Sequence, residues 1–165
     1  MEKGLISELK EFLKEANMAG YAGGEEKKWK KEEDNSTTIT HESSDGRWLF
    51  HDNFFGGEPY GGREVIFKDG QAVWMMVYYG EIVDKGLDKD KVYAFLQKSL
   101  SLADEDLPVR GPKEKKEEID GGEWFYENNW QGSLERFKGK EIIKINGKEI
   151  YNADYIGGLV DIKNN

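Results

Sequence analysis

The sequence predicts an α+β protein in which a unit of one helix followed by four antiparallel strands occurs twice. The repeat is visible in two pairs of matching blocks: residues 48–54 match residues 124–130, and residues 62–66 match residues 139–143. The spacing of the two copies differs by a single inserted residue. So many matches with only one gap are difficult to obtain by chance. We interpret the pattern as an internal duplication and expect antiparallel sheet packed against two helices, with pseudo-twofold symmetry.

The length of 165 residues suits a single domain that spans residues 1–165. A chain of this size buries roughly 70% of the surface that its unfolded form exposes, so a substantial core forms without disulfides. We expect the first repeat at about residues 5–84 and the second at about residues 88–161.

Two amphipathic helices are predicted from apolar residues at helical spacing. The first covers about residues 5–18, and its apolar face carries Leu5, Ile6, Leu9, Phe12, Leu13 and Ala16. Gly20 and the glycine pair at 23–24 are expected to end it. In the second helix Asp88 or Asp90 is the expected N-cap. Its apolar face carries Val92, Phe95, Leu96, Ser99, Leu100 and Ala103.

Strand-forming residues alternate with turn residues over the rest of the chain. Residues 37–41 and 47–54 predict a hairpin. Trp29 is the only large anchor in the polar residues 25–36. Residues 55–62 and 104–121 carry too much glycine, proline or charge for regular structure. Tight turns are predicted at three glycine pairs, 56–57, 61–62 and 157–158.

The clearest hairpins surround Asp69-Gly70 and Asn146-Gly147, which are sequences typical of two-residue type I′ turns. Such a turn fixes the register of its strands. The expected opposite pairs are Val65 with Trp74, Ile66 with Val73, Glu64 with Met75, Ile142 with Tyr151, Ile143 with Ile150 and Glu141 with Asn152. Because both faces of the first hairpin are apolar, we expect a helix on one side of it and further protein on the other.

The composition excludes several classes of function. Cysteine is absent, so the chain has no disulfides, thiolate metal sites or cysteine nucleophiles. The net charge of −9 argues against a nucleic-acid partner, and acidic residues flank the basic stretches at 27–31 and 113–116. No apolar run reaches the roughly 20 residues needed to span a membrane. We expect a cytoplasmic protein without nucleic-acid or membrane partners.

Four polar residues are the first candidates for a ligand-binding site. Glu64 and Glu141 occupy equivalent positions in the two repeats, and the expected register places Asn152 and Asp154 on the same face as Glu141. If the repeats pack about a twofold axis, the four side chains converge. Paired carboxylates then share a proton, bind a hard cation or bind a small ligand. The alternative is that each glutamate accepts hydrogen bonds at a strand start or faces solvent.

The two histidines offer a weaker pattern. His41 and His51 lie on the two strands of the first predicted hairpin, where they would be near neighbours, and Asp52 follows His51. A His-Asp or His-His metal pair is one interpretation, but the chain has no third histidine to complete a site, and surface or capping roles are the alternative. The sequence also lacks a Gly-x-Ser-x-Gly elbow and a phosphate-binding glycine loop. We therefore expect no metal and no cofactor, and we assign no catalytic residue.

Aromatic residues make up 13% of the chain, and most of them are expected in the core. Two helices cannot cover aromatic residues on both faces of a sheet, so a pocket or a partner surface is the alternative for some of them. The candidates for ligand contact are Trp74, Tyr78 and Tyr155. The residues expected to stay partly exposed, beside glycine-rich loops, are Phe54, Phe55 and Trp130.

Short motifs of aromatic and glycine residues occur along nearly the whole chain, at Tyr21-Ala-Gly, residues 51–57, residues 62–65, residues 73–80, Arg110-Gly-Pro and residues 155–158. In these motifs the sequence resembles an uncharacterised microbial family of unknown function. Some members of that family are similar to sensory or partner domains placed behind a helix-turn-helix regulator, and we expect no such regulator before Leu5. The resemblance implies no catalytic residues.

Three functions follow as hypotheses. The first is a module that binds a small molecule or a protein without catalysis, in a cleft between the repeats. The second is a hydrolase or metal-dependent enzyme that uses Glu64, Glu141 and Asp154. The third is a structural domain that forms a homodimer through exposed sheet edges.

Overall fold

The computed structural model describes residues 2–21 and 28–161 of the chain. Within these residues one α-helix precedes each group of strands: α1 (Glu2–Tyr21) and α2 (Lys89–Leu100). The strands are β1 (Lys28–Lys31), β2 (Thr37–Glu42), β3 (Trp48–Phe55), β4 (Tyr60–Lys68), β5 (Gln71–Ile82), β6 (Glu114–Ile119), β7 (Gly122–Ser133), β8 (Arg136–Ile145) and β9 (Lys148–Leu159).

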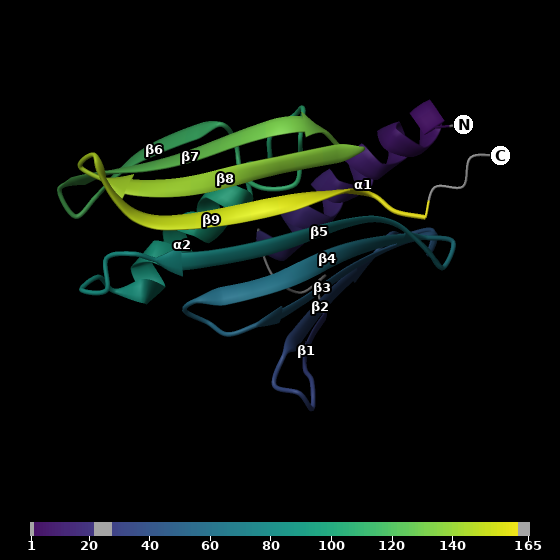
Figure 1. Ribbon diagram of the computed structural model, residues 1–165, viewed down its shortest axis with the longest axis horizontal. Helices are drawn as coiled ribbons and strands as arrows, with labels where there is room; N and C mark the ends of the chain where they lie inside the picture. The colour runs from purple at the N-terminus through teal and green to yellow at the C-terminus, as the bar shows by residue number, and fades with distance from the viewer. Residues whose placement is uncertain (1, 22–27, 162–165) are drawn as a thin grey trace.

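All nine strands of the described residues form one antiparallel sheet, in the order β1-β2-β3-β4-β5-β9-β8-β7-β6. The two halves of the sheet meet where β5 pairs with β9, and there Tyr78 lies opposite Tyr155. Figure 1 shows both helices behind the sheet, on the same face. The predicted α+β class, with antiparallel sheet and two packed helices, is confirmed. The internal duplication itself stays a prediction.

Both predicted hairpin tips are confirmed. Asp69 and Gly70 have φ values of 50° and 80°, and Asn146 and Gly147 have φ values of 49° and 81°. Positive φ at both central residues is the mark of a type I′ turn, whose twist matches that of the flanking strands.

A β-bulge near each tip shifts the register away from the predicted one. In the first hairpin the shift falls between Ile66 and Phe67, so that Ile66 pairs with Trp74 and Val73 becomes the extra residue. The predicted pairing of Ile66 with Val73 is therefore wrong, and Val65 and Glu64 also pair one residue further along β5 than predicted.

The second hairpin carries the same shift, between Ile143 and Lys144. Glu141 consequently lies opposite Ala153, and Asn152 pairs with Ile142. A slip of one residue turns a side chain to the other face of the sheet. The bulge thus separates Asn152 from the face that carries Glu141.

The helices differ from prediction only at their ends. Helix α1 continues through Gly20, while the glycine pair at 23–24 lies outside the described residues. Asp88 caps α2 as expected, because its Oδ1 accepts the backbone N–H of Asp90 at 2.9 Å. Ala103 lies beyond the end of α2.

Three segments expected to be irregular or to turn belong to strands instead. The glycine pair at 61–62 lies in β4, the pair at 157–158 lies in β9, and β6 forms within residues 104–121. A type I′ turn at Asp120 and Gly121, with φ values of 51° and 78°, joins β6 to β7. This Asp-Gly pair is the sequence signal that could have revealed the β6–β7 hairpin.

The core lies between the sheet and the helices. Leu9 and Leu13 of α1 pack with side chains of β3, β4 and β5, and Val92 and Phe95 of α2 pack with side chains of β7, β8 and β9. Most of the aromatic residues on this face are buried, as predicted.

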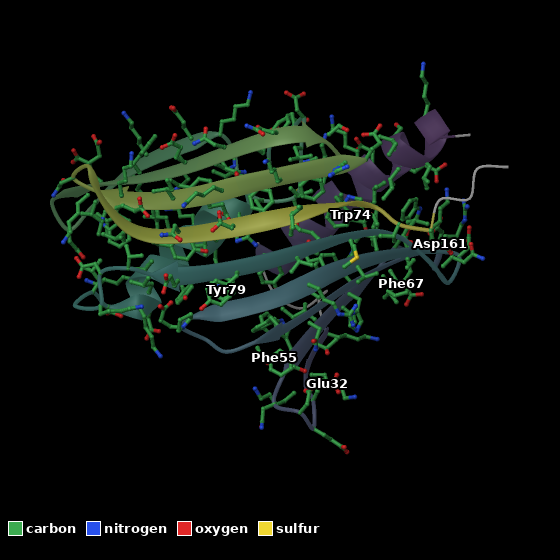
Figure 2. All side chains as sticks on the ribbon, in the orientation of Figure 1. Glu32, Phe55, Phe67, Trp74, Tyr79 and Asp161 are labelled. Carbon is green, nitrogen blue, oxygen red and sulfur yellow. The ribbon has the colours of Figure 1, made fainter. Side chains whose placement is uncertain are left out.

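The opposite face of the sheet is open, so the expectation that protein covers both sides of the central hairpin is wrong. Val77, Tyr79 and Ile156 are 47%, 58% and 57% exposed there. Figure 2 labels Tyr79 on β5. Each helix has a single apolar stripe, and both stripes pack on the other face; no helix of residues 2–21 or 28–161 remains to cover this one.

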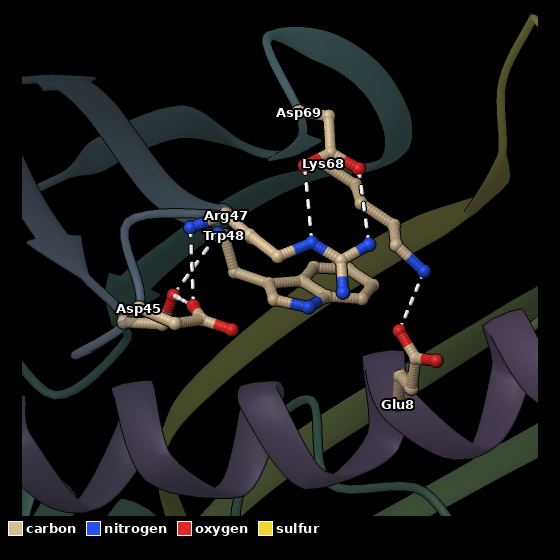
Figure 3. Close-up of polar contacts among 7 residues, drawn as sticks. Glu8, Asp45, Arg47, Trp48, Lys68 and Asp69 are labelled. Atoms are coloured by element: carbon tan, nitrogen blue, oxygen red, sulfur yellow. Dashed lines mark hydrogen bonds and ion pairs between the residues drawn. The ribbon is translucent and has the colours of Figure 1, made fainter.

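Exposed ion pairs orient the first hairpin tip (Figure 3). Arg47 donates from Nε and Nη2 to the two carboxylate oxygens of Asp69, at 3.1 Å each. Lys68 Nζ donates to Glu8 of α1 at 2.5 Å and lies 5.0 Å from the centroid of the Trp48 ring. Pairs as exposed as these contribute about 1 kcal/mol at most, so they position the tip more than they stabilise it.

Two glycines make room for the tyrosines at the centre of the sheet. Gly62 lies opposite Tyr78, and Gly139 lies opposite Tyr155. A Cβ atom would lie 2.7 Å from Tyr78 Oη at Gly62 and 2.2 Å from Tyr155 Cζ at Gly139. Both distances are shorter than van der Waals contact, so each tyrosine ring occupies the space that a side chain would need.

Replacing Gly139 by alanine should destabilise the protein, because the Tyr155 ring must move. We expect a loss of about 1–3 kcal/mol in the free energy of unfolding, measured by urea denaturation. Gly57→Ala is the matched control, since no atom lies within 4 Å of a Cβ placed there. Its effect should stay within about 0.5 kcal/mol. Equal stabilities of Gly139→Ala and the wild type would contradict this packing.

Candidate functional site

Glu64 and Glu141 both lie on the helix-covered face and are buried, at 3% and 0% exposed. They stand on β4 and β8, with β5 and β9 between them in the sheet. The structure places both in one buried group of polar side chains. This polar cluster consists of Asp52, Glu64, Tyr78, Arg110, Tyr126, Asn128, Glu141 and Tyr155.

Glu141 is held by two partners. Its Oε1 accepts a hydrogen bond from Arg110 Nε at 2.5 Å, and its Oε2 accepts one from the Tyr126 hydroxyl at 2.6 Å. Arg110 is itself only 5% exposed. Burying an ion costs several kcal/mol, so a carboxylate at this depth depends on a charged partner and on further hydrogen bonds.

Two tyrosines make matched hydrogen bonds on either side of the sheet centre. The Tyr78 hydroxyl donates to Asp52 Oδ1 at 2.5 Å, and the Tyr155 hydroxyl donates to Asn128 Oδ1 at 2.6 Å. Asp52 and Asn128 occupy matched positions in the repeated sequence blocks. The same position therefore holds a carboxylate in one half and a neutral amide in the other.

Sequence reasoning missed Arg110, which lies in the segment 104–121 that was expected to be irregular. Leu107 and Val109 are 0% and 2% exposed and anchor this segment in the core. The side-chain amide of Asn17 in α1 also donates a hydrogen bond to the Pro108 carbonyl at 2.6 Å. The apolar residues at 107 and 109, on either side of a proline, are the signal that the segment packs inward.

A cavity of about 300 Å³ opens beside the polar cluster, between α2 and strands β1 to β5. We call it the aromatic pocket. Its aromatic lining consists of Trp29, Phe54, Tyr60, Tyr78 and Tyr93. Helix α2 adds Leu96, Gln97 and Leu100, and the charged lining groups are Asp52 and Arg110. A cavity of this size, apolar with a few polar groups, is typical of small-molecule sites.

The aromatic walls of the pocket pack against one another. Trp29 and Phe54 meet edge to face, with ring centroids 6.4 Å apart. Tyr60 lies 5.9 Å from both Tyr78 and Tyr93, and Tyr93 donates a hydrogen bond to Glu58. Because each ring is held by another ring or by a hydrogen bond, the pocket is already formed without a ligand.

Burial raises the pKa of the tyrosine hydroxyls in the polar cluster. For Tyr78 burial is the largest cause, and the charges of Asp52 and Glu64 raise the pKa further. For Tyr126 burial again comes first, followed by the charge of Glu141. These hydroxyls therefore stay protonated at neutral pH and act as hydrogen-bond donors.

Asn152 and Asp154 do not join the polar cluster, so the predicted convergence of four polar residues is wrong. Asn152 donates to Glu149 at 2.8 Å, and Asp154 is exposed. The β-bulge in the β8–β9 hairpin places both on the open face of the sheet.

Among the three aromatic candidates, only Tyr78 lines the aromatic pocket. Trp74 is fully buried, and its indole N–H donates to the Leu134 carbonyl at 3.0 Å. Tyr155 belongs to the polar cluster through Asn128. Phe54 and Trp130 are half-buried and Phe55 is exposed, as predicted.

His41 and His51 lie on neighbouring strands but on opposite faces, so the expectation that they are near neighbours is wrong. His41 is buried and its Nε2 lies 2.8 Å from Glu15 Oε1. His51 is half-buried on the open face, where burial and the nearby charge of Arg63 lower its pKa. The part of the chain that the structure describes contains no group of three or more histidine, aspartate or glutamate residues able to hold a metal ion.

Removing Arg110 while Glu141 remains should destabilise the protein strongly, because a buried carboxylate loses its charged partner. We expect Arg110→Met to cost about 3–5 kcal/mol in the free energy of unfolding, measured by urea denaturation. The double variant Arg110→Met/Glu141→Gln should recover much of that loss, since it also removes the carboxylate whose oxygen is paired with Arg110. Strictly additive losses in this double-mutant cycle would show that the two residues are not coupled.

Comparison with known proteins adds a family but no activity. No curated protein and no solved structure matches the chain. No helix of residues 2–21 or 28–161 is both long and apolar enough to cross a membrane. One family model matches residues 52–160, a span that contains the whole polar cluster, and it is described as a domain of unknown function. The chain belongs to this family, DUF5680.

Proposed function

We propose that this domain binds a small molecule in the aromatic pocket and that binding, rather than catalysis, is its function. The observation that supports the proposal is the combination of packed aromatic walls with charged groups that are already oriented. Tyr78 holds Asp52, and Glu141 holds Arg110. A site whose groups are fixed in advance loses little entropy when a ligand binds.

A hydrolase or metal-dependent enzyme based on Glu64, Glu141 and Asp154 has less support. Asp154 lies on the open face of the sheet, away from the two glutamates. Both carboxylate oxygens of Glu141 accept hydrogen bonds from protein groups, and the residue is fully buried. A general acid or base must reach its substrate directly or through one water molecule.

Dimerisation through the sheet edges also has less support. The outermost strands of the sheet are β1 and β6. Lysines on an edge strand oppose pairing with another chain. The lysines on β1 and β6 are Lys28, Lys30, Lys31, Lys115 and Lys116. The composition of both edges therefore favours a sheet that does not extend into a neighbour.

We also infer that the protein arose by duplication of a helix-plus-four-strand unit. The same β-bulge follows both hairpin tips. A glycine lies opposite the central tyrosine in each half, and each tyrosine donates to residue 52 or its matched residue 128. Two halves that arose independently would not be expected to share these three features.

A fragment screen by saturation-transfer NMR on the full chain tests the binding proposal. Gln97 is exposed and lines the pocket, so Gln97→Trp should place a large ring in its mouth. We expect this variant to weaken the fragments that bind the wild type by at least about tenfold. Ala94→Trp, an exposed position on the same helix but outside the pocket lining, is the matched control and should bind as the wild type does. Fragments that bind Gln97→Trp and the wild type equally would contradict the proposal.

A further inference from the structure

The charges around the aromatic pocket are unequal. The polar cluster contains the carboxyl groups of Asp52, Glu64 and Glu141 but a single guanidinium, that of Arg110. All four residues are at least nine-tenths buried. Carboxylates crowded in a buried site disfavour one another's ionisation, and an added positive charge relieves that cost.

Arg110 is paired with the Glu141 carboxylate, so it does not give the pocket a net positive charge. Its Nε lies 2.5 Å from Glu141 Oε1, and its guanidinium carbon lies 5.7 Å from the centroid of the Tyr78 ring. The pKa of the Tyr78 hydroxyl, which lies in the pocket wall, depends on the balance between these carboxyl groups and Arg110. Burial is the largest cause of the raised pKa of this hydroxyl, the charges of Asp52 and Glu64 raise the pKa further, and the opposing influence of Arg110 is the smallest.

The remaining lining of the pocket also suits a positive charge. Trp29, Phe54, Tyr60 and Tyr93 line the same cavity as Asp52. The face of an aromatic ring is electrostatically negative and attracts ammonium and guanidinium groups, most strongly when the ring is tryptophan. The chain makes such contacts elsewhere, since Lys115 Nζ lies 4.4 Å from the centroid of the Phe95 ring.

We propose that the ligand of the aromatic pocket is an organic cation, with an amine or quaternary ammonium group attached to an aromatic or aliphatic body. The cationic group lies against Asp52, and the body packs between the aromatic walls and the apolar side chains of α2. This inference rests on the proposed function, because it requires that the pocket bind a small molecule.

Neutral and anionic ligands fit the same space less well. A neutral ligand does not offset the excess of carboxyl groups over guanidinium groups in the polar cluster. Of the two charged residues that line the pocket, Arg110 attracts an anion but is already paired with Glu141, and Asp52 repels it. The charge of the ligand is therefore the property that an experiment should vary while its shape stays constant.

Three probes with one aromatic body carry out this comparison: 2-phenylethylamine, 2-phenylethanol and 3-phenylpropionate, titrated into the full chain by calorimetry at neutral pH. They are cationic, neutral and anionic. We expect the dissociation constant of the amine to be at least about tenfold lower than that of the alcohol, and the propionate to bind most weakly.

The variant Asp52→Asn tests whether Asp52 causes the preference of the pocket for a cationic ligand. An amide is compatible with this position, because Asn128 accepts the Tyr155 hydroxyl at the matched place in the second half. We expect Asp52→Asn to bind the amine and the alcohol with equal affinity. Its urea denaturation midpoint, compared with that of the wild type, verifies that the variant is folded.

The outcomes separate the two proposals. If the alcohol or the propionate binds as tightly as the amine, and Gln97→Trp abolishes that binding, the pocket binds small molecules but the preference for cations is wrong. A preference for the amine that survives in Asp52→Asn would also overturn the inference. If none of the three probes binds at millimolar concentration, the inference fails, and the fragment screen decides the binding role independently.

Discussion

The buried ion pair between Arg110 and Glu141 is the interaction on which the helix-covered face of the sheet depends. It joins the segment after α2 to β8 and places the guanidinium over the Tyr78 ring, 5.7 Å from its centroid. Replacing such a pair by apolar residues often leaves stability unchanged or improved, because desolvation offsets the attraction. The pair therefore contributes a fixed arrangement of polar groups more than it contributes net stability.

The features that the sequence could predict are those that local chemistry decides. Asp69-Gly70 and Asn146-Gly147 tolerate positive φ, so the two hairpin tips follow from the residues alone. Asp88 caps α2 because an aspartate side chain can accept the first free backbone N–H groups of a helix. Glu64 and Glu141 are buried on one face, but the sequence argument left their exposure to solvent open and grouped them with Asn152 and Asp154 through the wrong register.

The features that the sequence could not predict depend on packing between distant residues. A two-residue turn fixes only the first pairs of a hairpin, and the bulge at Val73 then changes every later pair. Arg110 enters the site from a segment without periodicity, because Leu107 and Val109 find partners in the core. Strand β6 alternates exposed and half-buried residues of which Ile119 alone is apolar, so its sequence carries no apolar pattern, and only the Asp120-Gly121 turn marks it.

The two halves of the sheet share a framework and differ where the pocket lies. In both, a glycine opposite a central tyrosine leaves room for the ring, and the tyrosine hydroxyl reaches the next strand but one. The partner of that hydroxyl is a carboxyl group only in the first half, at Asp52. Strand β1, which has no counterpart beside β6, adds Trp29 to the same half. The two halves of the sheet are nearly symmetrical, but strand β1 occurs only in the first half, and Asp52 has a carboxyl oxygen where Asn128 has an amide nitrogen. The sheet therefore forms one aromatic pocket with a carboxylate in its wall.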